Sequence, residues 1–398
     1  MVGAGLRRVR GWLGAKLELS RGGGGRKIRS MEGLRGLAAL LVFGVHYAYF
    51  IAPYLERSPG FAAAVNRLSQ VGNTGVDLFF VLSGYLIYGS LISKAQPFGL
   101  YLARRVWRIY PVFITVFVLY AALSYLAPGG ERVPQGLPDA LFYFAANLLL
   151  LGPLLVPVQP LVPVTWSLSY EVFFYVLTPL LIAAFNLRRR SAAWRVTFVL
   201  LLAGLFLAAC AVFPGRSRLA LFAAGVLLHE ALRSGRLRAP DALTTAAVCV
   251  AGLGTYLALF RGRADVPLNT LALSLTFFTL CFHLFSPGRS WLRRVFEWTP
   301  LRHFGNMSYS FYMTHVLSMN LLMFVLPGPG TLFGGNVPLA YVALLPLSFL
   351  ASWLPAFALF VAVERPLSLK NPRQHPLSPP KPVEAAGSPR LVRKPGGT

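Results

Sequence analysis

Long apolar stretches separated by short polar segments dominate the hydrophobic pattern of the chain. A helix needs about 20 apolar residues to cross a hydrocarbon core of roughly 30 Å, and ten runs have about this length. The pattern therefore predicts an all-α, polytopic integral membrane protein with ten transmembrane helices. The predicted spans are residues 36–53, 75–93, 109–127, 165–187, 196–213, 217–232, 242–260, 267–286, 303–326 and 338–363.

An eleventh apolar segment, residues 139–156, is interpreted through the charges that follow it. If it crossed the membrane, the arginines at 188–190 and every later basic cluster would change sides. If it is re-entrant or interfacial, 31 of the 38 Lys and Arg residues lie on one side, as the positive-inside rule requires. We therefore expect segment 139–156 to be re-entrant or interfacial, and both termini to lie in the cytoplasm. The predicted location is the inner (plasma) membrane.

The two ends of the chain differ from this membrane part. Residues 1–29 are basic and have no apolar stretch long enough for a signal peptide, so they are predicted to form a cytoplasmic tail. Residues 369–398 are rich in Pro, Gly and Lys, a composition typical of disorder. Residues 30–368 are then expected to form a single membrane domain.

Composition excludes several classes of protein. Hydrophobic residues make up 56% of the chain and charged residues 13%, whereas soluble proteins carry about 25% charge. The net charge of +25 would suggest nucleic acid in a soluble chain. Here the basic residues form short clusters between apolar runs, so we expect a lipid bilayer and no nucleic acid as partner. Metal-ligand spacing is absent, and no metal is predicted.

Ionisable residues inside the predicted spans are candidates for function, because each costs about 2.5–3.5 kcal/mol at mid-bilayer. These are His46, Asp77, Glu171 and His315. Either histidine could instead be structural, hydrogen-bonded to a neighbouring helix, and Asp77 could cap the start of the second span. Glu171 has fewer structural explanations.

A second group of candidates is basic. Arg35 precedes His46 by eleven residues, about three helical turns and about 16 Å, so both side chains lie on one side of the first span. This spacing suits a long anionic ligand whose reactive end reaches a histidine base. Arg104, Arg105 and Arg108 surround Trp107 at the inner end of the third span, where they could bind phosphates and stack on a base. Basic residues also anchor the inner ends of most spans, so topology alone is an alternative explanation.

Six motifs, taken in order, resemble the acyltransferase family 3 membrane proteins. They are residues 33–39 with His46 (an Arg-x10-His signature), 75–87, 104–111, 165–171, 308–310 with His315, and 364–366. The resemblance implies a ten-span core that transfers an acyl group, usually acetyl, from coenzyme A. The acceptor would be a hydroxyl on an extracytoplasmic glycan or a small molecule. The chain departs from the family pattern after Glu171, where Val172 and Phe173 replace an acidic residue and a Gln, and at Glu32, which replaces an Asp.

The resemblance and the residues together give a predicted mechanism. Acetyl-CoA, or another acyl-CoA, is the donor substrate, and no tightly bound cofactor is expected. Its phosphates would bind Arg35, Arg104, Arg105 and Arg108 beside Trp107, and His46 would deprotonate the acceptor hydroxyl. Either Glu171 or Asp77 would orient His46, and an acetyl-histidine relay is an alternative. The candidate substrate-binding residues are Ser83, Trp166, Ser167, Tyr312 and His315, with Ser167 and Tyr312 as oxyanion donors.

Two other classes of function remain open from the sequence. A secondary transporter or a glycan flippase would also place histidines and carboxylates at mid-membrane. A transporter predicts inverted repeats, which the sequence does not display, and a flippase would not need three arginines beside a tryptophan. The sequence leaves open the acceptor, the acyl length, the side from which the acceptor enters, the use of an acyl-enzyme and the oligomeric state.

Overall fold

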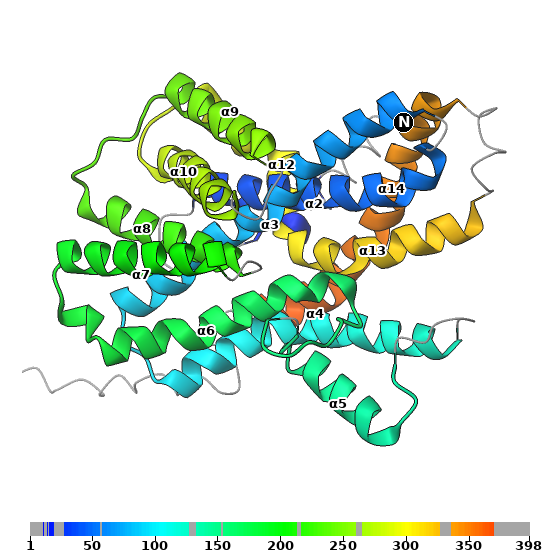
Figure 1. The fold of residues 1–398 in the computed structure, drawn as a ribbon, viewed down its shortest axis with the longest axis horizontal. Helices are drawn as coiled ribbons and strands as arrows, with labels where there is room; N and C mark the ends of the chain where they lie inside the picture. The colour runs from blue at the N-terminus through cyan, green and yellow to red at the C-terminus, as the bar shows by residue number, and fades with distance from the viewer. Residues whose placement is uncertain are drawn as a thin grey trace, which may run out of the picture.

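The computed structural model describes residues 11, 14, 16–19, 28–55, 58–126, 133–152, 154–212, 216–259, 265–326 and 336–369. Within these ranges the chain is helical and contains no strand (Figure 1). The helices are α2 (Arg29–Leu55), α3 (Pro59–Ser93), α4 (Phe98–Leu126), α5 (Leu137–Leu148), α6 (Trp166–Ala184), α7 (Ala192–Val212), α8 (Ala220–Ser234), α9 (Ala242–Ala258), α10 (Val266–Phe285), α11 (Trp291–Phe296), α12 (Thr299–Asn306), α13 (Ser308–Val325), α14 (Val337–Leu359) and the π-helical η5 (Phe360–Ser368). Short 3₁₀ turns occur at Pro163–Thr165, Leu187–Arg189 and Ser217–Leu219.

Seven of the helices in the described part of the chain are long and apolar enough to cross a membrane. They are α2, α3, α4, α6, α7, α10 and α14 with η5, and each overlaps one of the ten predicted spans over most of its length. The other three predicted spans, 217–232, 242–260 and 303–326, correspond to α8, α9 and α13. The 15 residues of α8 extend only about 22 Å, and the hydroxyl groups of α13 lower its apolarity. The protein is a multi-pass helical membrane protein.

Segment 139–156 contains a helix too short to cross a bilayer. The 12 residues of α5 extend about 18 Å, and the chain then continues through turns. Asn147 satisfies the polar backbone of these turns, because its Oδ1 accepts from Leu161 N (2.7 Å) and its Nδ2 donates to Gln159 O (3.4 Å). Buried backbone outside helices and strands needs such partners for its polar groups.

Helix α3 is the centre of the bundle. It packs on α2, α6 and α8 (Figure 1). In its most apolar stretch of 18 residues, 72% of the residues are buried. The crossing of α3 and α8 is close because each helix has a glycine there. A Cβ at Gly84 would overlap the carbonyl of Phe222, and a Cβ at Gly225 would overlap the carbonyl of Val81. Small residues permit this approach between membrane helices.

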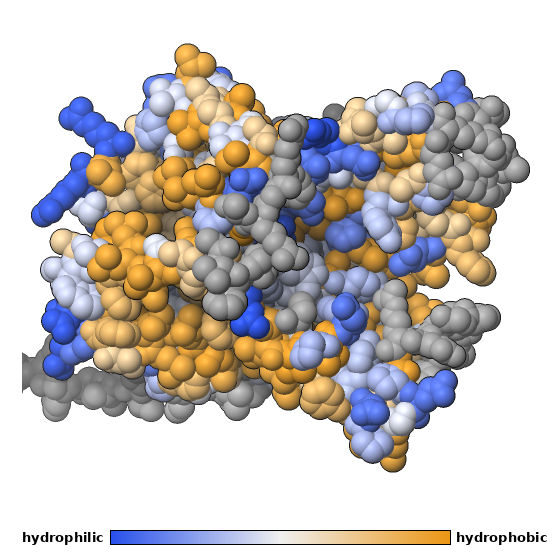
Figure 2. All heavy atoms as spheres, viewed as in Figure 1, coloured by the Kyte–Doolittle hydropathy of each residue, from blue (hydrophilic) through white to orange (hydrophobic). Residues whose placement is uncertain are grey.

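Apolar side chains also cover the outside of the bundle. Figure 2 shows them gathered over α6 and α7, with polar residues towards the edges of the view. Leu201 and Leu205 of α7 are 62% and 72% exposed, and Leu180 of α6 is 56% exposed. An exposed apolar belt of this kind matches a surface that faces lipid tails.

Part of the predicted N-terminal tail packs on the membrane domain. The carboxylate of Glu18 lies 2.9 Å from Arg302 Nη2 and 3.2 Å from His303 Nε2 on α12. Leu17 and Leu19 on either side are buried. These residues were expected to lie outside the fold. Of the predicted C-terminal tail, residues 369–398, only Leu369 belongs to the described residues.

Candidate active site

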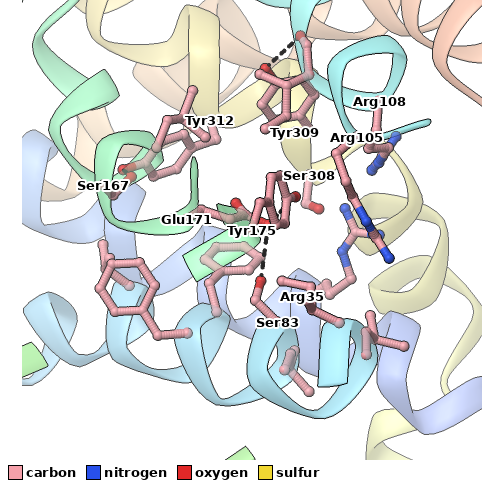
Figure 3. Close-up of a pocket in the computed structure, with 18 residues that line it drawn as sticks. Arg35, Ser83, Arg105, Arg108, Ser167, Glu171, Tyr175, Ser308, Tyr309 and Tyr312 are labelled. Carbon is pink, nitrogen blue, oxygen red and sulfur yellow. Dashed lines mark hydrogen bonds between the residues drawn. The ribbon is translucent and has the colours of Figure 1, made fainter. Parts of the chain in front are cut away.

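A cleft with about 910 Å³ of empty space, including the part open to solvent, lies among α2, α3, α4, α6 and α13. Figure 3 shows its polar lining. Arginines gather at one end, hydroxyl groups of Ser167 and Tyr312 lie at the other, and Glu171 and Tyr175 lie between them. The polar lining residues are Arg35, Ser83, Arg105, Arg108, Ser167, Glu171, Tyr175, Ser308, Tyr309 and Tyr312.

The basic end of the cleft is built by α2 and α4. Arg105 donates from Nη2 to Ser90 Oγ (3.3 Å), and its guanidinium lies over the rings of Tyr101 and Tyr175, 5.3 and 5.4 Å from their centroids. Such cation–π contacts hold an arginine in a defined position. Arg108 and Arg35 complete this end (Figure 3).

The predicted basic motif divides between two faces of α4. Arg105 and Arg108, three residues apart, line the cleft, whereas Arg104 and Trp107 do not. Arg104 is exposed and donates to Gln96 (3.0 Å), and Trp107 is 37% exposed. The expected stacking of a base on Trp107 beside all three arginines therefore does not match the geometry, because a helix of 3.6 residues per turn turns these two side chains away.

The middle of the cleft is organised by Glu171. Its Oε1 accepts from Tyr175 OH (2.6 Å) on the next turn of α6 and from Ser83 Oγ (3.1 Å) on α3. Ser83 lines the cleft, and its assignment to substrate binding stays a prediction. Within the described residues Glu171 makes no contact with His46, so it does not orient that histidine as expected.

The far end of the cleft carries the two predicted oxyanion donors. Ser167 Oγ and Tyr312 OH lie 2.7 Å apart, and Tyr312 OH donates to Val164 O (3.0 Å). The two residues come from α6 and α13, so tertiary packing joins two motifs that lie far apart in the chain.

His46 and His315 form a contacting pair beyond this end. Nδ1 of His46 lies 3.2 Å from Nε2 of His315, and the ring centroids are 4.8 Å apart. His46 does not line the cleft itself. Tyr312 connects the two regions, because it lines the cleft and its ring centroid lies 5.9 Å from that of His315. Arg35 and His46 lie on one continuous helix, α2, so the predicted spacing of about 16 Å holds.

Asp77 occupies a different site. The side chain is buried in the interior of α3, and its Oδ1 lies 3.3 Å from Arg218 Nε. Since α3 begins at Pro59, the alternative that Asp77 caps a helix is wrong. The guanidinium of Arg218 lies over the ring of Trp166, 5.0 Å from its centroid. Asp77 therefore pairs with an arginine and not with His46 among the described contacts, and Trp166 belongs to this second cluster.

The structure adds Tyr175, which the sequence did not single out, and gives positions to Ser308, Tyr309 and Glu364, which the sequence identified only as members of motifs without a role. Tyr175, Ser308 and Tyr309 line the cleft, and Glu364 lies 2.9 Å from Arg108. The i, i+4 spacing from Glu171 to Tyr175 was a usable signal. Groups of three or more His, Cys, Asp or Glu side chains that could hold a metal are absent from the described residues.

Comparison with known proteins defines the family. The family model described as an acyltransferase domain (Acyl_transf_3) matches residues 28–357. The chain belongs to this acyltransferase family. This membership supports an acyl-transferring enzyme with an acyl donor and an acceptor, and it does not favour a transporter or a flippase. No solved structure matches the chain.

Three relatives illustrate the range of the family. The acyltransferase MdmB of Streptomyces mycarofaciens is 25% identical over 323 residues, which is 73% of this chain and 79% of MdmB. The exopolysaccharide production protein ExoZ of Rhizobium meliloti (strain 1021) is 25% identical over 311 residues, 75% of this chain and 90% of ExoZ. SAS0844 of Staphylococcus aureus (strain MSSA476), which has O-acetyltransferase in its name, is 26% identical over 171 residues, 39% of this chain and 25% of SAS0844.

Proposed function

We propose that this protein is an O-acetyltransferase that moves an acetyl group from cytoplasmic acetyl-CoA to a hydroxyl group of a cell-envelope glycan or a small molecule. The observation that supports it most directly is the convergence of Arg35, Arg105 and Arg108 at one end of a single cleft. The positive-inside distribution of charge favours a cytoplasmic position for this end, on the side where acyl-CoA is made.

The polarity of the cleft favours one orientation of the donor. Guanidinium groups bind phosphates through paired, charge-assisted hydrogen bonds, so the 3′-phosphate and pyrophosphate of coenzyme A belong at the basic end. The carboxylate of Glu171 in the middle of the cleft would repel them, which keeps the phosphates beside Arg35 and Arg105. The uncharged pantetheine arm then extends towards Tyr312 and the histidine pair.

The chemical step follows from the groups at the far end. His46 takes the proton of the acceptor hydroxyl while the oxygen of that hydroxyl attacks the thioester carbonyl carbon. Tyr312 and Ser167 stabilise the oxyanion by turning their hydroxyl protons, which both point to Val164 O in the free protein, towards the developing negative charge. When the carbon–sulfur bond breaks, the coenzyme A thiolate takes the proton from His46, so the products are the acetyl ester and free coenzyme A.

The acceptor enters from the side opposite the basic end in this proposal. Trp166 precedes Ser167 of the far end in the chain, and the guanidinium of Arg218 lies over its ring; we assign these two side chains to the acceptor. The word exopolysaccharide in the name of ExoZ supports a glycan acceptor, and MdmB shows that the family also contains proteins named simply as acyltransferases. Both acceptor classes therefore belong in an assay.

Thiol release tests the proposal without an acceptor. The protein purified in detergent is mixed with acetyl-CoA, and free thiol is followed over time for the wild type and His46→Ala. Water then takes the place of the acceptor hydroxyl, so slow release of free coenzyme A and acetate by the wild type, and none by His46→Ala, is the expected result. Arg189→Ala, an exposed arginine of the cytoplasmic cluster, controls for the loss of one charge and should release thiol normally. No release by the wild type, with or without glycan acceptors, would contradict the proposal.

A further inference from the structure

The histidine pair joins two helices that are remote in the chain. His46 on α2 and His315 on α13 are separated by 269 residues, and their rings meet edge to face at 79°. His315 is only 1% exposed, whereas His46 is half-buried. Each ring has one nitrogen at the contact. The hydrogen-bond partners of the ring nitrogens determine which of them hold protons.

The protons of His315 follow from its backbone partners. Its Nδ1 lies 3.1 Å from Phe311 O and 2.8 Å from Tyr312 O. A carbonyl oxygen only accepts, so Nδ1 must hold a proton. The described contacts of this buried ring include no carboxylate, and an unpaired buried cation is costly. His315 is therefore neutral, and its Nε2 presents a lone pair to His46.

The protons of His46 follow in turn. Its Nδ1 faces two acceptors, Val42 O at 2.9 Å and the lone pair of His315 Nε2 at 3.2 Å. Both require a proton on Nδ1. A neutral imidazole has only one N–H, so Nε2 of His46 has the lone pair. Within the described part of the chain both hydrogen bonds of His46 use Nδ1, which leaves Nε2 for a substrate proton.

We infer that His315 is the positioning residue of His46. It accepts the Nδ1–H of His46, holds the ring with Nε2 as the basic atom, and shares the positive charge that forms when Nε2 takes the proton of the acceptor hydroxyl. A neutral imidazole thus occupies the place that a carboxylate has in a serine-protease triad. This inference rests on the proposed function, and it replaces both the assignment of His315 to substrate binding and the orientation of His46 by a carboxylate.

Steady-state kinetics separate a positioning role from a binding role. In the thiol-release assay His315→Ala should lower kcat about 100-fold and leave the KM for acetyl-CoA unchanged. His315→Gln provides an amide oxygen that accepts a hydrogen bond, so its kcat should be at least tenfold higher than that of His315→Ala. His283→Gln is the matched control, because His283 bonds to Pro240 O and Ser290 Oγ outside the site, and its activity should equal that of the wild type. A raised KM with an unchanged kcat in His315→Ala would overturn the inference.

Nitrogen NMR tests the same inference without activity. In protein labelled with ¹⁵N-histidine, the signals of His46 among the six histidines are identified by their loss in His46→Gln. We expect a protonated Nδ1 and an unprotonated Nε2 for His46 in the wild type. A protonated Nε2 would overturn the inference even if thiol release is normal. If the wild type releases no thiol, the proposed function fails and the NMR result still decides the arrangement of the pair.

Discussion

Nη1 of Arg108 lies 2.9 Å from Oε1 of Glu364, whose side chain is fully buried. The same carboxylate accepts from Ser310 N (3.1 Å) and Ser310 Oγ (2.7 Å). Glu364 therefore joins α4, α13 and the π-helical η5 around the basic end of the cleft. Arg108 has a structural partner as well as a place in the cleft lining.

This ion pair predicts that Arg108 is needed for stability. Removing one member of a buried ion pair leaves an uncompensated charge and costs about 3–5 kcal/mol, and Arg108→Ala should fall near the lower limit because its side chain is 24% exposed. Thermal unfolding in detergent should show a lowered midpoint, and Glu364→Gln in the same chain should restore part of it. An unchanged midpoint for Arg108→Ala would mean that the pair contributes nothing.

Arg105 provides a cleaner test of phosphate binding. Its described partners are Ser90, Tyr101 and Tyr175, so its loss leaves no buried carboxylate behind. A hydrogen bond to a charged group contributes about 1.5–3 kcal/mol, and Arg105→Ala should raise the KM for acetyl-CoA about 10- to 100-fold. With acetyl-pantetheine, which lacks the nucleotide phosphates, wild type and variant should have equal kcat/KM. A penalty of similar size for both donors would show that Arg105 does not contact the phosphates.

Tyr312 lies between the cleft and the histidine pair. As an oxyanion donor it should contribute about 10²-fold to kcat, so Tyr312→Phe should lower kcat by that factor and leave the KM for acetyl-CoA unchanged. The matched control is Tyr110→Phe, which removes a hydroxyl that donates to Leu148 O (3.0 Å) outside the cleft. Equal activity of the two variants would remove Tyr312 from the chemical step.

The crossing of α3 and α8 predicts contrasting effects for two glycines. Gly225→Ala places a Cβ against the backbone of Val81, so the helices must separate and unfolding should occur at a lower temperature. A Cβ at Gly204 of α7 would meet no atom within 4 Å, and alanine favours a helix by about 1 kcal/mol over glycine. Gly204→Ala should keep or raise the unfolding midpoint. Equal midpoints for the two variants would contradict the close crossing.

Hydrophobic pattern alone was sufficient for the fold class. Each of the seven long apolar helices in the described chain overlaps a predicted span, because a run of about 20 apolar residues has few other solutions. The hydrophobic pattern predicted helix length less well for helices that pack against other helices. Helix α8 packs on α3, α7 and α10, so its apolar side chains are covered by protein, and the helix has only 15 residues.

The sequence predicted which residues belong to the candidate site, but it did not predict which of them contact one another. His46 and His315 were both identified as costly intramembrane groups, yet their contact arises from the packing of α2 on α13. Neither helix alone specifies it. The same limit explains Asp77, whose partner Arg218 lies in a remote segment of the chain, and Arg104, whose orientation depends on how α4 is rotated against its neighbours.

Direct binding of acetyl-CoA tests the central claim most directly. Equilibrium binding of radiolabelled acetyl-CoA to detergent-purified protein would be measured for the wild type, His46→Ala and Arg105→Ala. We predict that the wild type and His46→Ala bind with equal affinity, because His46 acts in chemistry, and that Arg105→Ala binds at least tenfold more weakly. Absence of binding by the wild type, or equal binding by Arg105→Ala, would contradict the assignment of the cleft to the acyl donor.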